Sequence, residues 1–209
     1  MKISKAVSIC FVGIDGSGKG TLMKKISDHY GMNMNIKQKL IYFGWSPFLP
    51  STKWISKRLE EKDYKINRPV KKKVSFLQEI ALIYMIIEYS ARYIFQIVPF
   101  TYMKRIILID RYIYDIFVQN DYASRRKWFI NALQVFPQPD FTFFLDIGPE
   151  QAYQRKPELS RELLEKHRAK YNYLYKKLPL RRIDTAQNIE ACIKEIDDHT
   201  KKLMRQKFT

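Results

Sequence analysis

Cysteine is scarce in this chain of 209 residues, which contains only Cys10 and Cys192. Two cysteines so far apart make neither a disulfide framework nor a metal-binding motif. They fit a reducing compartment, and we expect the cytoplasm. The three histidines, His29, His167 and His199, show no ligand-like spacing, so no structural metal site is expected.

Glycine and proline are also few, with 7 and 9 residues, which excludes a collagen-like or low-complexity chain. A long charge-free run is missing as well. The most apolar region, Val74 to Met103, contains Glu79, Glu88, Arg92 and Pro99. It therefore falls short of the roughly 18 apolar residues that a membrane span requires. We predict a buried helix with internal polar contacts.

Acidic residues are comparatively few. The chain has 21 of them and 38 lysines and arginines, which gives a net charge of +17. This surplus favours a polyanionic partner such as nucleic acid, an anionic membrane surface or a phosphorylated small molecule. Between Lys53 and Lys73 basic residues outnumber acids nine to three. No nucleic-acid-binding motif accompanies the charge, so no specific nucleic acid is expected. A solvated basic surface and peripheral membrane contact remain alternatives.

Short β-rich runs alternate with longer helical stretches along the chain. This alternation predicts an α/β fold with a parallel sheet and right-handed βαβ crossovers. Domains run to about 100–200 residues, so we expect a single domain over 1–209. The expected strands are 6–12, 39–43, 105–110, 141–146 and 180–184, and the expected helices include 21–30, 74–98, 158–177 and 189–204. Ligands should then bind at the carboxyl ends of the strands.

The sequence GIDGSGKGT, from Gly13 to Thr21, follows the first apolar strand and opens a helix. That context makes a match to a phosphate-binding P-loop meaningful. Glycines at 13, 16 and 18 let the backbone wrap closely and turn its N–H groups inward. The helix N-terminus adds its positive dipole end beneath the phosphates. Lys19 supplies a mobile charge to the β- and γ-phosphates.

The match departs from the strict pattern after Lys19, where Gly20 stands in place of a serine or threonine and Thr21 follows. Adenylate kinases also read lysine-glycine-threonine. The departure leaves two roles open for Thr21, as a Mg²⁺ ligand or as a contact to the α-phosphate. The expected cofactors are ATP and Mg²⁺. The expected ATP-binding residues of the loop are Gly13, Asp15, Gly16, Ser17, Gly18, Lys19, Gly20 and Thr21.

Four segments, in this order, resemble the thymidylate kinases. They are Ile14-Asp15-Gly16, Asp110-Arg111-Tyr112, Pro139-Asp140 leading to Arg155, and Ile183-Asp184-Thr185-Ala186-Gln187. The P-loop alone is generic, whereas the four in order are specific and span most of the chain. The resemblance implies a three-layer P-loop NTPase fold with a five-stranded parallel sheet and a short lid over about 150–166. It implies transfer of the ATP γ-phosphoryl group to a nucleoside monophosphate, and dTMP is the best candidate for the acceptor. It leaves open whether the protein is a homodimer.

The resemblance also implies a role for each residue of the strand-end motif. Asp110 corresponds to an aspartate that orients Mg²⁺ through water. Arg111 corresponds to an arginine whose planar group forks two hydrogen bonds to the acceptor phosphate. Tyr112 is expected to contact the acceptor beside it. The alternative for Asp110 and Arg111 is a surface ion pair at a strand end.

Two further residues are implied on the acceptor side. Asp15 resembles an aspartate that contacts the acceptor sugar hydroxyl, and its alternative is a turn residue bonded to its own backbone. Arg92 aligns with an arginine that reads the acceptor base. Its alternative is a buried partner for Glu88, four residues earlier on the same helix.

The catalytic arginine of this family comes from either the P-loop or the lid. Gly16 and Ser17 leave the P-loop without one, so Arg155 and Arg161 of the lid are the candidates, with solvated helix charge as the alternative for each. Thr185, Ala186 and Gln187 resemble the turn that frames the adenine. The predicted catalytic residues are Asp15, Lys19, Asp110, Arg111, Arg155 and Arg161.

The sequence departs from the family at two places, both on the acceptor side. Residues 42–50 read YFGWSPFLP, without the arginine that usually grips the acceptor phosphate there. After Tyr112 the family continues with serines, whereas this chain has Asp115, which would repel a nearby phosphate. Two other functions therefore remain open. One is a P-loop kinase for a sugar, polyol or lipid-linked acceptor, and the other is a basic nucleic-acid- or membrane-binding protein with a vestigial ATP site.

Overall fold

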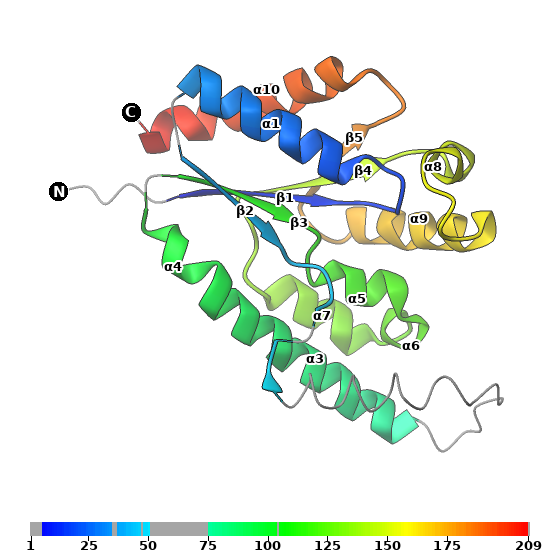
Figure 1. The fold of residues 1–209 in the computed structure, drawn as a ribbon. Helices are drawn as coiled ribbons and strands as arrows, with labels where there is room; N and C mark the ends of the chain where they lie inside the picture. The colour runs from blue at the N-terminus through cyan, green and yellow to red at the C-terminus, as the bar shows by residue number, and fades with distance from the viewer. Residues whose placement is uncertain (1–5, 35–36, 47, 51–74, 104, 209) are drawn as a thin grey trace.

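The computed structural model describes residues 6–34, 37–46, 48–50, 75–103 and 105–208. The basic segment from Lys53 to Lys73 lies outside them. A five-stranded parallel sheet forms the centre of the molecule, with strand order β2-β3-β1-β4-β5 (Figure 1). The strands are β1 (Val7–Val12), β2 (Gln38–Tyr42), β3 (Ile106–Asp110), β4 (Phe141–Asp146) and β5 (Leu180–Asp184). The predicted fold class and all five strands are confirmed.

Both faces of the sheet are covered, which explains why its central strands are apolar along their whole length. All six residues of β4 are buried. On β1, Ile9 and Phe11 face the cluster formed with the N- and C-terminal helices, whereas Cys10 and Val12 belong to the cluster on the other face. The fold therefore has three layers, helix–sheet–helix.

Figure 1 shows how the helices divide between the two faces. On one face lie α1 (Lys19–Met34) and α10 (Ile189–Phe208). The other face carries α3 (Ser75–Gln96), α4 (Val98–Thr101), α5 (Tyr114–Gln119), α6 (Asp121–Ser124), α7 (Lys127–Val135) and α9 (Arg161–Tyr175). The helix α8 (Pro149–Arg155) packs beside the loop after β1.

The helix expected over 158–177 begins later than predicted. Residues 158 and 159 lie in a turn, and Ser160 is the N-cap of α9, where its hydroxyl oxygen accepts a hydrogen bond from the Leu163 N–H. A serine at this position satisfies a helix N–H that has no carbonyl partner. The segment predicted to be a lid, about 150–166, consequently consists of α8, a short turn and the start of α9.

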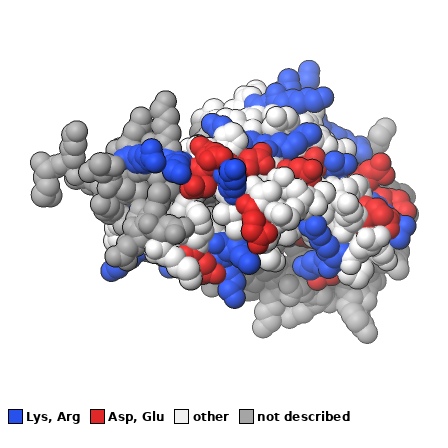
Figure 2. Space-filling view, turned by 90° about the horizontal axis from the view of Figure 1, so that it is seen from above, with Lys and Arg blue, Asp and Glu red and all other residues white. Residues whose placement is uncertain are grey.

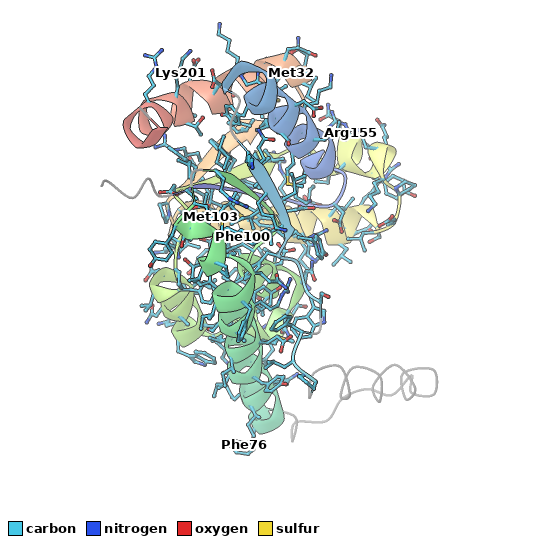
Figure 3. The ribbon with its side chains drawn as sticks, turned by 60° about the vertical axis from the view of Figure 1, so that its left-hand side comes forward. Met32, Phe76, Phe100, Met103, Arg155 and Lys201 are labelled. Atoms are coloured by element: carbon cyan, nitrogen blue, oxygen red, sulfur yellow. The ribbon has the colours of Figure 1, made fainter. Side chains whose placement is uncertain are left out.

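The apolar helix α3 is buried on one side only, so the prediction of a buried helix was wrong for its outer side. Arg92 points inward and donates to the carbonyl oxygens of Gly44 at 2.6 Å and Tyr42 at 3.0 Å. The outer side exposes an apolar stripe formed by Phe76, Ile80, Ile83, Ile87 and Ile94, and Phe76 marks one end of it in Figure 3. By length and composition alone, Gln78–Thr101 would suit a membrane span.

The strand order places β1 between β3 and β4, which lead to opposite halves of the sheet. A ligand crevice forms at such a switch point, outside the carboxyl ends of the strands. The loop after β1 is the glycine-rich segment of the sequence, and the ends of β3 and β4 carry Asp110 and Asp146.

Candidate active site

The loop between β1 and α1 depends on glycine at two positions. Gly16 and Gly18 have φ angles of 82° and 84°, in the left-handed region that favours glycine. A Cβ on Gly16 would also lie 2.3 Å from the carbonyl oxygen of Ala152 in α8. Glycine at this position therefore lets the lid helix pack directly against the loop.

Lys19 is the first residue of α1, and its side chain is only 8% exposed. Its Nζ donates to the carbonyl oxygens of Gly13 and Ile14, at 2.9 Å each. Burial and the nearby Arg111 lower the pKa of Lys19 to about 8. The loop thus holds a buried ammonium group that an anionic ligand would stabilise.

A cleft of about 630 Å³ brings the predicted catalytic groups together from the loop, two strand ends and the lid. Its lining residues are Asp15, Gly16, Gly18, Lys19, Gly20, Thr21, Tyr42, Asp110, Arg111, Arg155 and Lys156. Five of the six predicted catalytic residues lie here. The sixth, Arg161, does not.

Asp110 ends β3 and faces the loop. Its Oδ1 is buried, and within the described part of the chain it has no hydrogen-bond partner. Burial raises the pKa of Asp110, although Lys19 and Arg111 act in the opposite direction. A buried carboxylate oxygen without a donor suits a metal-bound water, because Mg²⁺ usually keeps several waters and takes one or two carboxylates. The residues present therefore fit Mg²⁺.

Arg111 follows β3 with a φ angle of 66°, and its N–H donates to the Phe11 carbonyl oxygen at 3.0 Å. Its guanidinium lies between two carboxylates. Nη1 donates to Asp115 Oδ2 at 2.7 Å, and Nη2 donates to Asp15 Oδ1. Burial lowers the pKa of Arg111, but the two carboxylates outweigh it and the net pKa is raised.

A second cavity of about 300 Å³ continues from the loop towards α10. It is lined by Ser17, Gly18, Thr21, Leu22, Arg155, Thr185, Gln187, Ile189 and Cys192. Ala186 lies in the same turn, where its N–H donates to Asp184 Oδ1 at 2.9 Å. Arg155 lies at the border between this cavity and the cleft, and Figure 3 shows it beside α1.

A third cavity of about 490 Å³ is lined mainly by residues of α3, α5 and α6. It is lined by Trp45, Gln78, Met85, Tyr89, Asp115, Ile116, Gln119, Asn120, Asp121 and Tyr122. The lining includes three aromatic rings and three side-chain amides. Asp115 borders this cavity and contacts Arg111, so a molecule bound in it would lie next to the cleft.

Three of the predicted catalytic and acceptor-binding residues line none of these cavities. Arg161 is exposed, pairs with Glu150 at 2.9 Å and covers the Tyr153 ring. Tyr112 is fully buried, and its hydroxyl donates to the Pro137 carbonyl oxygen. Arg92 is 2% exposed and donates to backbone carbonyls of the segment after β2. We therefore leave Arg92 and Tyr112 out of the proposed acceptor contacts.

The sequence analysis missed several residues of the site. Lys156 and Tyr42 line the cleft. On α9, Tyr171 donates to Asp115 Oδ1 at 2.5 Å, and Arg168 donates to both carboxylate oxygens of Asp146, at 2.7 and 3.1 Å. Arg168 and Tyr171 are three residues apart and so share one helix face. This three-residue spacing was the sequence signal that could have indicated Arg168 and Tyr171.

Comparison with known proteins decides the family. A protein named "Probable thymidylate kinase" from Sulfolobus acidocaldarius is 32% identical over 201 residues, which cover 92% of this chain and 93% of that protein. The chain belongs to the thymidylate kinase family. The thymidylate kinase of Leptospira borgpetersenii is 26% identical over 206 residues, 93% of each chain.

The three-dimensional comparison agrees at the level of the fold. The crystal structure of thymidylate kinase from Ehrlichia chaffeensis matches with a TM-score of 0.57 at 20% identity, covering 94% of this chain and 99% of that one. No family model matches the sequence. The relatives confirm the resemblance to the thymidylate kinases that the sequence indicated.

Proposed function

We propose that this protein transfers the γ-phosphoryl group of ATP to dTMP. Membership of the thymidylate kinase family supports ATP-dependent phosphorylation of a nucleoside monophosphate. The observation that carries the proposal is the cleft itself. It joins Lys19, Asp110, Arg111 and Arg155, with one cavity at each side for the two substrates.

On the donor side, the second cavity suits the adenosine of ATP. The Thr185–Gln187 turn and Cys192 would border the adenine, and the P-loop N–H groups would surround the phosphates. Lys19 would neutralise the β- and γ-phosphates. Arg155 reaches the cleft from α8 and is the candidate to stabilise charge on the transferring group.

Mg²⁺ would be held through water by Asp110, with the Thr21 hydroxyl as the second candidate. When bound, the ion neutralises charge on the phosphate oxygens. The protein contributes orientation, because Asp110 is fixed at a strand end opposite the P-loop. No side-chain nucleophile is required, since phosphoryl transfer relies mostly on positioning and electrostatics.

On the acceptor side, Arg111 would bind the phosphate of dTMP and the third cavity would take the nucleoside. Asp15 lines the cleft and can accept a hydrogen bond from the sugar hydroxyl. Gln78 and Gln119 line this cavity together with Trp45 and Tyr89. Amides of this kind can donate to and accept from a pyrimidine edge.

The direct test is acceptor-dependent release of ADP, measured with dTMP, other monophosphates and a set of sugars and polyols. We expect dTMP to give the highest kcat/KM. Lys19→Ala should remove turnover while leaving the far-UV spectrum and the melting transition intact. Turnover of Lys19→Ala close to that of the unmodified protein would refute the assignment of the phosphate-binding loop.

A second candidate function is phosphorylation of a neutral hydroxyl acceptor, such as a sugar, polyol or lipid-linked sugar. The observation that favours it is the pairing of Arg111, whose Nη1 and Nη2 already bind Asp115 and Asp15. An acceptor without a phosphate would leave both ion pairs intact. The same assay decides, because only this candidate predicts turnover with a sugar and none with millimolar dTMP.

The third candidate, a nucleic-acid- or membrane-binding protein, has less support from the described surface. Figure 2 shows lysines and arginines interleaved with acidic side chains on the face that it presents. Binding of DNA or of anionic vesicles with a steep salt dependence would favour it. We place the kinase in the cytoplasm, where ATP is available and buried free thiols such as Cys10 stay reduced.

A homodimer is also part of the proposal. The exposed stripe on α3, at positions 76, 80, 83, 87 and 94, repeats at intervals of four, three, four and seven residues. That spacing is typical of a helix that packs along another helix. A second copy supplies an identical stripe, which a two-fold axis makes self-complementary. The inward-facing Glu88 and Arg92 argue against a membrane span for the same helix.

A further inference from the structure

The acceptor arginine is held by a buried carboxylate. Asp115 is 2% exposed, and its Oδ2 accepts from Arg111 Nη1 at 2.7 Å and from Gln119 Nε2 at 3.4 Å. Its Oδ1 accepts from the Tyr171 hydroxyl at 2.5 Å. Both carboxylate oxygens therefore have donors, and the group cannot turn without losing one of them.

Tyr171 makes this arrangement rigid. It lies on α9, it is 2% exposed, and its ring stacks on Phe144 of β4 with centroids 5.3 Å apart. Burial and the negative charge of Asp115 raise the pKa of Tyr171 well above its usual value. The hydroxyl consequently stays protonated and remains a donor to Asp115.

The two carboxylates that hold Arg111 differ in their surroundings. Asp15 belongs to the P-loop, is partly exposed and also faces Lys19 at 4.0 Å. Asp115 comes from α5, on the acceptor side. Without Asp115 the guanidinium would keep only its partner in the P-loop. We expect it to shift towards that loop, where it stays in the cleft but loses the orientation that transfer requires.

We propose that Asp115, fixed by Tyr171, is the positioning residue for Arg111, and that it favours turnover while weakening acceptor affinity. The positioning follows from the hydrogen bonds. The weaker affinity follows from charge, because a carboxylate beside the arginine offsets part of the attraction for an anionic acceptor. The proposal rests on the proposed function, in which Arg111 meets the acceptor phosphate.

The kinetic test uses Asp115→Asn, Tyr171→Phe and the double variant. For Asp115→Asn we expect kcat to fall about 10- to 100-fold, because a misplacement of about 1 Å in a group that orients the substrate can slow a reaction by that much. The KM for dTMP should stay the same or fall, because a negative charge is removed. For Tyr171→Phe we expect a smaller loss of kcat with the KM for dTMP unchanged. The double variant should match Asp115→Asn, since Tyr171 acts through Asp115.

Two matched variants serve as controls. Tyr173→Phe removes a hydroxyl from the same helix, where the ring stacks on Phe117 and is partly exposed. Glu165→Gln removes an exposed carboxylate from α9 that lines none of the three cavities. Both should keep kcat and both KM values. Loss of kcat in either control equal to that in Tyr171→Phe would show general loosening of α9 and would overturn the proposal.

Other outcomes also overturn it. One is an unchanged kcat in Asp115→Asn, and another is a raised KM for dTMP with kcat intact, which would make Asp115 an acceptor contact. If Asp115→Asn does not fold, Tyr171→Phe decides, since an unchanged kcat there refutes the positioning role. A ligand-free crystal structure of either folded variant tests the geometry without any acceptor. We expect the Arg111 guanidinium to move in Asp115→Asn, and an unmoved guanidinium would refute the proposal even if dTMP proves not to be the acceptor.

Discussion

Arg155 Nη2 donates a hydrogen bond of 3.0 Å to the carbonyl oxygen of Thr185, which ties the lid helix α8 to the turn after β5. The same guanidinium borders the cleft that contains Lys19 and Asp110. An arginine held between the turn after β5 and the P-loop could reach a transferring phosphoryl group without leaving the site. Arg161, the other arginine of the predicted lid, does not line this cleft.

We therefore expect Arg155→Ala to lower kcat by about 10³-fold or more, the range in which arginines contribute to phosphoryl transfer. The KM for ATP should change far less. Arg161→Ala is the matched control, because Arg161 pairs with Glu150 on the exposed surface. It should keep kcat within a few-fold. Steady-state kinetics at saturating MgATP measure both, and equal losses in the two variants would contradict the distinction.

The sequence predicted the sheet almost residue by residue, because buried parallel strands are apolar throughout and end at turn residues. It also located Lys19, Asp110 and Arg111, since a P-loop and a strand-end motif are local patterns. It could not choose between Arg155 and Arg161. Both are lid arginines in sequence, and only packing of α8 against Gly16 turns one of them into the cleft.

The acceptor side was harder for a different reason. Arg92 is a charged residue on an apolar helix, which suggests a functional contact. In the structure its guanidinium instead satisfies two backbone carbonyls and stacks on the Phe43 ring at 4.8 Å. The contact between Asp115 and Tyr171 joins residues 56 positions apart. No local pattern predicts a pair at that distance.

The buried Lys19 leads to a pH prediction. Its pKa is lowered to about 8 in the free protein, and bound phosphates should raise it again. Binding of MgATP above pH 8 must then take up a proton. At pH 8.5 this uptake is roughly 0.7 proton. Affinity for MgATP should accordingly fall as the pH rises from 8 towards 10.

Calorimetry in buffers of different ionisation enthalpy measures this proton uptake directly. Lys19→Arg supplies the control, because an arginine stays protonated across the range. It should bind MgATP without uptake and without the decline in affinity. Proton release by the unmodified protein at pH 8.5 would show that Lys19 is not the group that meets the phosphates.

Substitutions of Asp110 and Arg111, the two residues at the end of β3, should affect different ligands. Asp110→Asn keeps the shape of the side chain but removes its charge, so the Mg²⁺ concentration for half-maximal rate should rise and kcat should fall. Arg111→Lys should raise mainly the KM for the acceptor, because lysine cannot make the planar fork. Titrations of Mg²⁺ and of dTMP give both numbers. If Arg111→Lys raised only the KM for ATP, the assignment of the donor and acceptor sides of the site would be wrong.

The apolar stripe on α3 predicts that the protein forms a dimer. Substitutions on this one face of the helix should disrupt it. We expect sedimentation velocity to show a dimer at micromolar concentration. The double variant Ile83→Glu with Ile87→Glu should be a monomer, because like charges would meet across a two-fold axis. Val135→Glu, on an exposed residue of α7, is the control and should remain dimeric. A monomeric unmodified protein would remove the homodimer from the proposal.

The last prediction concerns dTMP itself, because its phosphate meets fewer free cations here than the family resemblance implies. Residues 42–46 and 48–50 contain no arginine, and Arg111 is already shared between Asp15 and Asp115. Loss of one charge-assisted hydrogen bond weakens binding by about 1.5–3 kcal/mol, on the order of ten- to a hundred-fold. We therefore expect dTMP to bind more weakly than in a thymidylate kinase that has the arginine.

This weaker binding is compatible with turnover, because affinity lost equally from the ground state and the transition state raises KM without lowering kcat. Calorimetric titration of dTMP, with and without a non-hydrolysable ATP analogue, measures it. Introducing an arginine at the exposed Ser46, the residue after Trp45 of the proposed acceptor cavity, should tighten dTMP binding and leave ATP binding unchanged. If this variant does not bind dTMP more tightly, the acceptor phosphate does not lie beside this segment. If the unmodified protein binds no dTMP at millimolar concentration yet turns over a sugar, the neutral-acceptor function replaces the one proposed.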